Sequence, residues 1–159
     1  MIGQMRTLLR VKELKEEQAF REVQRKRAEL REAEAAVVAA QAEVEASARS
    51  LPDREAQAYL AVLGRVVTLS AVDDVKAEVV RLQKEHQLLV DQLDSRKAAV
   101  RRVTDELAAA MAQFRERQKH RDKYVILTDT LAGEVAAAVE LREEGEIEDL
   151  FGTRRKKLA

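Results

Sequence analysis

Apolar residues recur at a seven-residue spacing along much of this 159-residue chain. Steps of alternately three and four residues from Val72 to Arg142 visit 21 positions, and 15 of these are apolar. A heptad repeat held in one register over this length is typical of a helix that supercoils with a partner helix. We therefore predict a long coiled-coil helix over about residues 71–143.

The first half of the chain carries a weaker repeat of the same spacing, formed by Val23, Leu30, Val37, Val44 and Leu51. Apolar spacing resumes after Pro52 and continues to about Val67, which predicts a first helical arm over about residues 4–67. The segment 50–53 interrupts the pattern, because proline fits either the first turn of a new helix or a kink in a continuous one. We expect a kink or a short break there.

Residues 68–70 separate the two repeats and are the predicted hairpin tip. Ser70 followed by Asp73 resembles the capping box that begins many helices. Folding at this point gives arms of nearly matched length, and antiparallel pairing then places Val23 opposite Phe114 and apolar positions opposite one another in the following heptads. The predicted fold is all-α: one long antiparallel two-helix coiled-coil hairpin over residues 1–145.

The composition fits long helices and excludes most sandwiches, barrels and Rossmann-type enzymes. The chain has 5 Gly, 1 Pro, 3% aromatic and 36% charged residues. It has no cysteine, and therefore no disulfide or thiolate zinc site. No stretch approaches the roughly 18 apolar residues of a membrane span, and charge comes too early for a signal peptide. We expect a cytoplasmic protein that does not insert into a membrane.

A search for catalytic chemistry finds little. The five glycines never cluster, and no phosphate-binding loop, metalloprotease helix or calcium-binding loop is present. A two-helix hairpin also encloses no substrate pocket. His86 falls at a core position opposite Pro52 and is interpreted as a tolerated side chain, since His120 lies too far away to share a metal ion. We expect no enzymatic activity, no cofactor and no metal.

The charges are unevenly distributed although 29 basic and 29 acidic residues cancel. Residues 6–31 hold nine Lys/Arg against five Glu, and residues 96–123 hold nine against four Asp/Glu. The hairpin register brings these stretches together as a basic belt, which is a candidate site for an anionic protein partner. The alternative is a solvated face with local pairs, such as Glu16 or Glu17 with Arg121. Nucleic acid fits poorly, because interleaved aromatic residues are missing.

The helix core changes character within this belt. Arg117 and Arg121 occupy successive core layers, after which Tyr124 returns to the core while Val125 and Ile126 point outward. Exposed apolar residues beside a basic cluster fit a docking surface. The candidate partner-binding residues are Arg10, Lys12, Lys15, Arg115, Arg117, Lys119, Arg121, Lys123, Tyr124 and Ile126.

The C-terminal residues run from an acidic stretch, 140–149, into a basic one, 154–157. Dense like charge and Gly145 predict a mobile charged tail over residues 146–159.

Three segments carry a resemblance to a known family: the N-terminal segment 8–15, the late segment 118–124, and the acidic then basic tail. On these residues the chain resembles the YscO family of type III secretion stalk proteins, which are relatives of the flagellar export protein FliJ. The resemblance extends over the whole chain.

The resemblance implies a fold similar to the coiled coil of the rotary ATPase gamma subunit. It also implies that the chain enters the central hole of a hexameric secretion ATPase, promotes its assembly and activity, and contacts the export-gate ring protein. Some family members also bind secretion chaperones. The implied location is the cytoplasmic periphery of the inner-membrane secretion apparatus.

We expect a monomer in isolation.

The alternative function is a structural or adaptor coiled coil, a dimerising scaffold without an ATPase partner.

Overall fold

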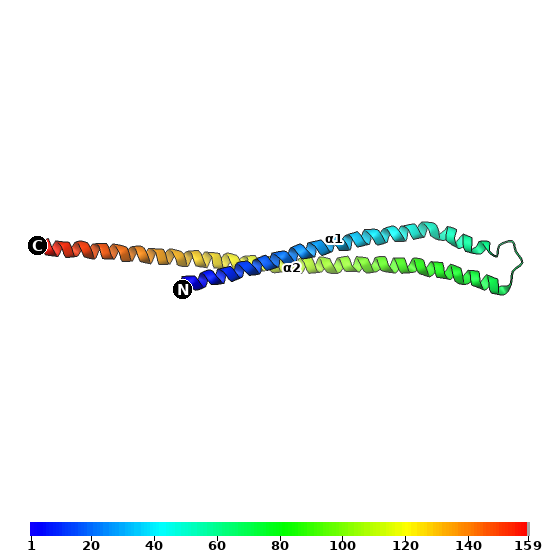
Figure 1. Cartoon of the computed structure of the whole chain (residues 1–159), viewed down its shortest axis with the longest axis horizontal. Helices are drawn as coiled ribbons and strands as arrows, with labels where there is room; N and C mark the ends of the chain where they lie inside the picture. Colours follow the sequence, from blue (N-terminus) through cyan, green and yellow to red (C-terminus); the bar gives the residue numbers. More distant parts are fainter. Residues whose placement is uncertain (159) are drawn as a thin grey trace. The chain divides into compact units, whose positions relative to one another are not determined.

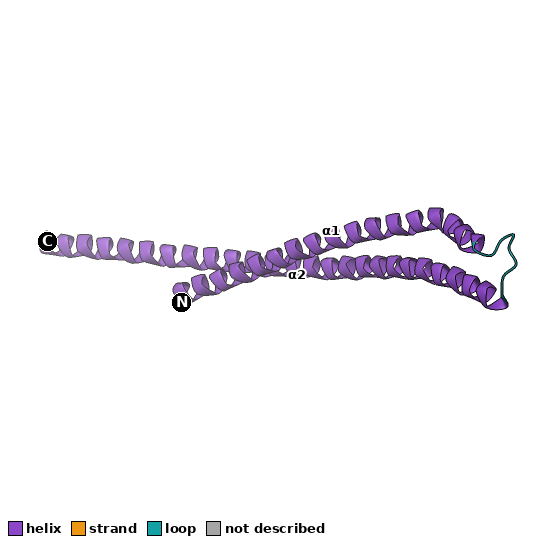
Figure 2. Cartoon of the chain, turned by 45° about the vertical axis from the view of Figure 1, so that its right-hand side comes forward, coloured by secondary structure: helices purple, strands orange, loops and turns teal. Residues whose placement is uncertain are grey.

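The computed structural model describes the backbone of residues 1–158 and the side chains of residues 1–153. Two helices account for nearly all of it: α1 spans Ile2–Leu60 and α2 spans Leu69–Leu158 (Figure 1). One loop joins them, and the described backbone contains no strand (Figure 2). The two helices pair antiparallel, so the predicted all-α two-helix hairpin is confirmed.

Contacts divide the chain into two compact units. Unit 1 consists of residues 1–23 and 110–159, and unit 2 consists of residues 24–109. Each unit contains a stretch of α1 and a stretch of α2. The loop lies in unit 2, and both chain termini lie in unit 1.

The core of unit 2 follows the predicted heptad positions. Its most buried side chains come from α2 and are Val75, Val79, Leu82, Leu93 and Val103. The apolar residues of α1 that the sequence pattern selected in this unit are half-buried: Leu30, Val37, Val44 and Leu51. Arg96 is the exception, because it was predicted at a core position and is exposed. A long charged side chain on a two-helix core can extend sideways into water, which removes the cost of burying its charge.

The loop is longer than predicted and begins earlier. α1 ends at Leu60 rather than near Val67, where the N–H groups of Val62 and Leu63 each donate to the carbonyl of Tyr59 at 3.1 Å. Gly64 then takes a φ of 68°, the left-handed conformation that glycine adopts without steric cost. The turn therefore occupies residues 61–68 instead of 68–70.

The start of α2 also differs from the prediction in its capping residue. The Thr68 hydroxyl accepts a hydrogen bond from the N–H of Ala71 at 3.2 Å, so Thr68 is the N-cap and α2 begins at Leu69. Ser70 was predicted as the cap but lies within the first turn of the helix. Threonine and serine are both favoured N-cap residues, so local sequence did not separate the two positions.

Pro52 lies inside a continuous α1, which decides between the two interpretations in favour of a kink. The helix changes direction in its cyan part (Figure 1). Proline lacks the N–H that would reach the carbonyl of Ala48. Near this site, Arg54 Nη2 donates to the carbonyl and the hydroxyl of Ser47, at 3.4 and 3.2 Å. The Ser47 hydroxyl also lies 2.9 Å from Nδ1 of His86, so the imidazole has a polar partner on α1.

Replacing this proline tests how much the kink costs. We expect Pro52→Ala to raise the free energy of unfolding by about 0.5–1 kcal/mol, because alanine restores a helical N–H and favours the helix interior. The gain stays below the full proline penalty, since alanine also frees the unfolded chain. Urea denaturation followed by circular dichroism measures the change. A loss of stability would show that packing in unit 2 requires the kink.

α2 continues far beyond the predicted end near residue 143. From Gly133 to Thr153 its side chains are exposed, apart from the half-buried Gly145. The prediction of core positions was wrong for three residues of this segment, which are exposed: Val135, Ala138 and Arg142. No described part of α1 covers these positions, so their side chains face solvent.

The backbone of the predicted mobile tail is helical as far as Leu158. Its mobility stays a prediction. The side chains of the basic residues 154–157 lie outside the part that the structure describes, and so does Ala159.

Candidate protein-interaction surface

Unit 1 contains a polar section in the core between its two helices. Glu16 of α1 and Arg121 of α2 form an ion pair with 3.0 Å between Oε2 and Nε, and their side chains are only 19% and 35% exposed. One turn earlier in α1, the ammonium of Lys12 lies 5.2 Å from the centre of the Tyr124 ring. Cation and ring at this distance attract one another. The alternative interpretation of the basic belt had named Glu16 or Glu17 as a local partner of Arg121, and the structure pairs Arg121 with Glu16.

An aromatic pair adjoins this polar section. The rings of Phe20 and Phe114 have centroids 5.6 Å apart and planes inclined at 51°. Tilted aromatic pairs at such distances are favourable beyond the apolar area that they bury. The polar core is therefore bounded by an apolar contact between the same two helices.

Several predicted partner-binding residues are occupied within the hairpin. Arg117 is half-buried, and with the Gln113 amide oriented to match, its Nε and Nη2 donate to the amide oxygen at 3.1 and 3.0 Å. Arg121 reaches Asp122 at 3.1 Å in addition to Glu16. Lys12 and Tyr124 face one another. These four side chains hold the two helices together or satisfy one another, and they are poorly placed to meet a partner.

Other predicted residues are exposed and unpaired. Among the residues that the structure describes, no carboxylate pairs with the exposed cations Lys15, Arg115, Lys119 and Lys123. By contrast, all carboxylates in residues 6–21 and 115–123 are engaged, in Glu13–Arg10, Glu16–Arg121, Glu17–Arg21, Glu116–His120 and Asp122–Arg121 contacts. These two segments hold ten Lys/Arg and five Asp/Glu, so the excess positive charge lies on the surface.

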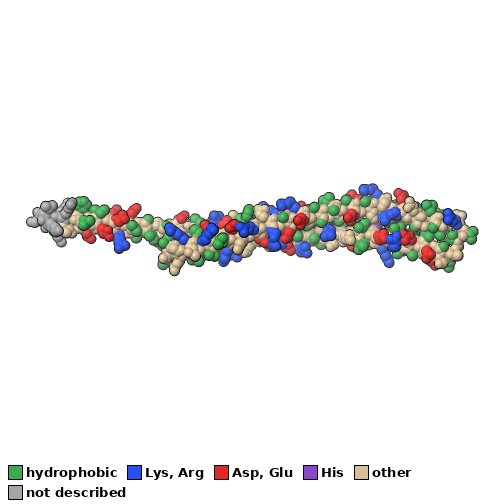
Figure 3. Space-filling model, in the orientation of Figure 1, with side chains coloured by type: hydrophobic (Ala, Val, Ile, Leu, Met, Phe, Trp, Pro, Cys, Tyr) green, Lys and Arg blue, Asp and Glu red, His purple; other side chains and the backbone are tan. Residues whose placement is uncertain are grey.

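Three of these cations share one face of α2. Arg115, Lys119 and Lys123 follow one another at four-residue spacing, which aligns side chains along one side of a helix. Ile126 continues this face and is 66% exposed, as the sequence predicted. The face points away from α1, because the side chains that meet α1 are those of Phe114 and Arg121. We call these four residues the basic face; blue Lys and Arg side chains mark this part of the molecule in Figure 3.

The part of the basic belt that lies in unit 2 is more fully neutralised. Lys26 is 16% exposed and donates to Glu106 of α2 at 2.8 Å and to Glu29 at 3.0 Å. The hydrogen bond to Glu106 raises the pKa of Lys26 above its usual value. The same bond lowers the pKa of Glu106 below its usual value. The pair links α1 to α2, and the sequence reasoning missed it because lysine at a core position resembles a surface residue.

These pKa shifts predict how pH affects stability. The lowered pKa of Glu106 means that its contribution is present above the usual carboxyl pKa of 4.5 and is lost as pH falls through the lowered value. The raised pKa of Lys26 means that its contribution is present below 10.5 and is lost only as pH rises through the raised value. Glu106→Gln should therefore lower the melting temperature slightly at about pH 7 and not at about pH 2.

Thermal unfolding followed by circular dichroism at the two pH values makes this comparison. Glu32→Gln is the matched control, because Glu32 is exposed and has no partner among the described residues. An equal effect of both substitutions at neutral pH would contradict the prediction.

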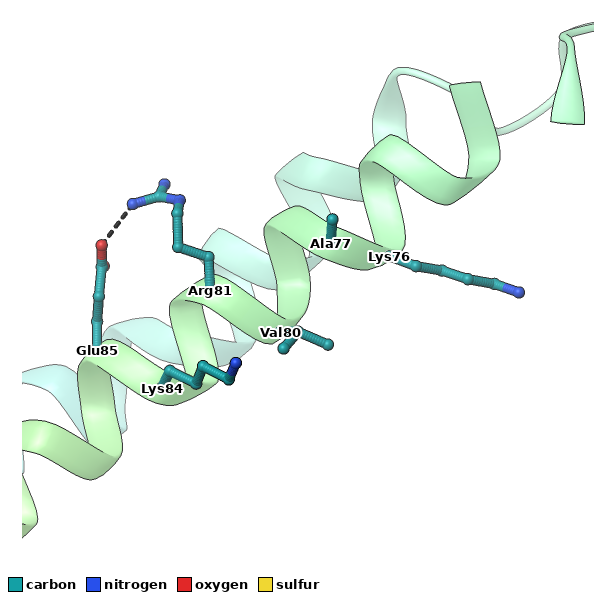
Figure 4. Close-up of a pocket in the computed structure, with 6 residues that line it drawn as sticks. All are labelled: Lys76, Ala77, Val80, Arg81, Lys84 and Glu85. Carbon is teal, nitrogen blue, oxygen red and sulfur yellow. Dashed lines mark hydrogen bonds and ion pairs between the residues drawn. The ribbon is translucent and has the colours of Figure 1, made fainter. Parts of the chain in front are cut away.

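A surface hollow on α2 in unit 2 offers no convergent chemistry. Its lining residues come from one helix, and Figure 4 shows Lys76 and Arg81 pointing in different directions. Arg81 pairs with Glu85 and with Glu78, which raises the pKa of Arg81 and lowers that of Glu78. Within the described residues, no group of three or more acidic or histidine side chains is arranged to hold a metal ion. Nor is any described helix long and apolar enough to cross a membrane.

Comparisons with known proteins assign the family. The fold matches the 2.8 Å crystal structure of the type III secretion protein YscO from Vibrio parahaemolyticus, with a TM-score of 0.89, 18% sequence identity and 93% coverage of both chains. No curated protein sequence matches this chain. The family model described as type III secretion protein YscO matches residues 5–153. Since this match spans nearly the entire sequence, the chain belongs to the YscO family of type III secretion proteins.

Proposed function

We propose that this chain is a noncatalytic central-stalk component of a type III secretion apparatus, which binds the hexameric secretion ATPase, promotes its activity and couples it to the export gate. Membership of the YscO family gives the chain a role in type III secretion. The ATPase, the export-gate ring protein and the secretion chaperones are the partners that we propose, at the cytoplasmic periphery of the inner membrane.

One observation carries the proposal: the basic face of α2 is exposed, and its cations have no ion-pair partner among the described residues. Unpaired cations raise the local potential and attract a partner with acidic groups. The exposed Ile126 beside them supplies apolar area of the kind found at the centre of protein interfaces. We therefore propose an acidic surface of the ATPase as the partner of this face.

The placement of the cations also suits coupling to a ring of subunits. The basic face lies on one side of α2, so a ring surrounding the helices would meet it with one subunit or two, and not with all subunits alike. A ligand shifts a conformational equilibrium only when it has different affinities for the states. Unequal contact of this kind favours one ring state over another.

Coupling requires a second surface, and unit 2 provides a candidate. The loop and its flanks expose large apolar side chains, which are Leu60, Leu63, Val66 and Leu69, the first two at 62% each. Exposed apolar groups in such number commonly mark a binding site. We propose that this surface serves a different partner from the one that binds the basic face.

The test uses the purified chain and its cognate ATPase. We expect the wild-type chain to bind the ATPase and to raise its rate of ATP hydrolysis. Reversing Arg115, Lys119 and Lys123 together to Glu should weaken binding by about tenfold or more and remove the stimulation, because it converts attraction into repulsion. Binding is measured by interferometry and activity by phosphate release.

The matched control reverses Arg49, Lys76 and Lys84 to Glu. These three residues are also exposed and unpaired among the described residues. They lie in unit 2, so the control changes the net charge by the same amount without altering the basic face. The control should keep full stimulation. The proposal fails if the wild-type chain neither binds nor stimulates the ATPase, or if both triple variants behave alike.

A further inference from the structure

The uncovered part of α2 continues the basic face with charges of the opposite sign. Glu140, Glu144 and Glu148 follow at the same four-residue spacing as Arg115, Lys119 and Lys123. With successive residues about 100° apart, all six side chains project within a sector of about 100° around the helix. We call this surface the bipolar face of α2.

All six charged side chains lie on the exposed surface of α2. Each of these residues is exposed, and none has an ion pair within the part of the chain whose side chains the structure describes. The three cations and the three glutamates all belong to unit 1 and lie on one continuous stretch of α2. Figure 3 shows red side chains near the grey C-terminal residues, with a blue one among them, and both colours intermixed further along the molecule.

From this arrangement we infer that the bipolar face binds a second copy of itself, antiparallel, about a two-fold axis. An isologous contact requires a surface that is complementary to itself after rotation. Antiparallel pairing places Arg115 opposite Glu148 and Lys119 opposite Glu144 of the second copy. Lys123 then meets Glu140, and the two-fold axis repeats all three ion pairs.

The residues near the axis allow the helices to approach. The axis passes between Leu131 and Ala132, where the outward surface carries Thr130 and Gly133. A Cβ added at Gly133 would meet no atom within 4 Å, so this side of α2 is open. In the same register Ile126 lies opposite Ala137 of the second copy, which covers a side chain that is 66% exposed.

This contact has a consequence for the proposed function. The dimer covers the cations of the basic face, so a chain in the dimer cannot present them to the secretion ATPase. Self-association and binding of the ATPase therefore compete. The dimer departs from the monomer that the sequence alone led us to expect.

Sedimentation equilibrium of the purified full chain tests the inference. We expect the wild-type chain to shift from monomer to dimer as its concentration rises. The dimer fraction should fall when salt increases from about 0.1 M to about 1 M, because the Debye length shortens from about 10 Å to about 3 Å. A chain that remains monomeric throughout, or a dimer indifferent to salt, would overturn the inference.

Charge reversal identifies the surface. Reversing the three cations to Glu, or the three glutamates to Lys, should each raise the dissociation constant of the dimer about tenfold or more. The two variants mixed in equal amounts should form a heterodimer, and one chain carrying all six reversals should recover self-association. The triple variant at Arg49, Lys76 and Lys84 should dimerise like the wild type. Failure of the mixture to associate would contradict this pairing.

A neutral position supplies a further test. Gly133→Arg favours the helix of the monomer but brings bulk and like charge against the second copy at the axis. We expect it to weaken the dimer while helicity is kept, and an unchanged dimer would refute the proposed axis. The glutamate-to-lysine variant separates this inference from the proposed function, because it removes the dimer and leaves the basic face free to stimulate the ATPase.

Discussion

Leu93→Ala is expected to lower the free energy of unfolding by about 2–3 kcal/mol, the largest effect of any single substitution proposed for this chain. Leu93 lies in the core of unit 2 and is 6% exposed. Truncation removes buried methyl groups and leaves a cavity that the surrounding side chains fill only in part. We place the effect toward the lower end of the usual range, because a core made by two helices can relax more easily than one enclosed on all sides.

The same helix supplies the control for this substitution. Leu88 is 57% exposed, so Leu88→Ala should change the free energy of unfolding by no more than about 0.5 kcal/mol. Urea denaturation followed by circular dichroism at 222 nm measures both free energies of unfolding. This wavelength reports helix content. Equal effects of the two substitutions would mean that the core does not lie where the structure places it.

The second large prediction concerns the ion pair in the polar core of unit 1. Replacing one partner should lower the stability of the chain, and replacing both should raise it. Glu16→Leu should destabilise the chain by about 1–2 kcal/mol, because it leaves the half-buried guanidinium of Arg121 without its partner across the core. Replacing both Glu16 and Arg121 by Leu should instead raise stability above wild type by about 1–2 kcal/mol. Two apolar side chains then fill a core layer that the ion pair occupies at a cost in desolvation.

Function should respond differently from stability in these variants. The double replacement leaves Arg115, Lys119 and Lys123 in place on the outer face of α2, so stimulation of the ATPase should persist. A double variant less stable than wild type would show that the ion pair makes a net favourable contribution. Loss of stimulation in a more stable double variant would indicate that the polar core itself takes part in binding the partner.

For the ten candidate binding residues, the sequence predicted burial better than it predicted pairing. The sequence placed Arg117, Arg121 and Tyr124 in core layers and Ile126 outside, and each lies there. It could not tell which of the basic residues would be engaged within the hairpin. Lys12 and Lys15 are both lysines of the first arm, yet Lys12 meets the ring of Tyr124 and Lys15 remains exposed without a carboxylate partner among the described residues.

The amino-acid sequence by itself determined the helical pairing of this protein, because a heptad repeat expresses the geometry of each helix and needs no knowledge of distant residues. From Val75 to Val103 it also identified the core positions of α2 that the structure buries. The tertiary structure alone decided where α1 ends, which hydroxyl caps α2, and where the core ends for lack of a facing helix. The end of α1 and the cap of α2 depend on small energy differences between neighbouring positions. The end of the core depends on which residues of the other helix lie opposite.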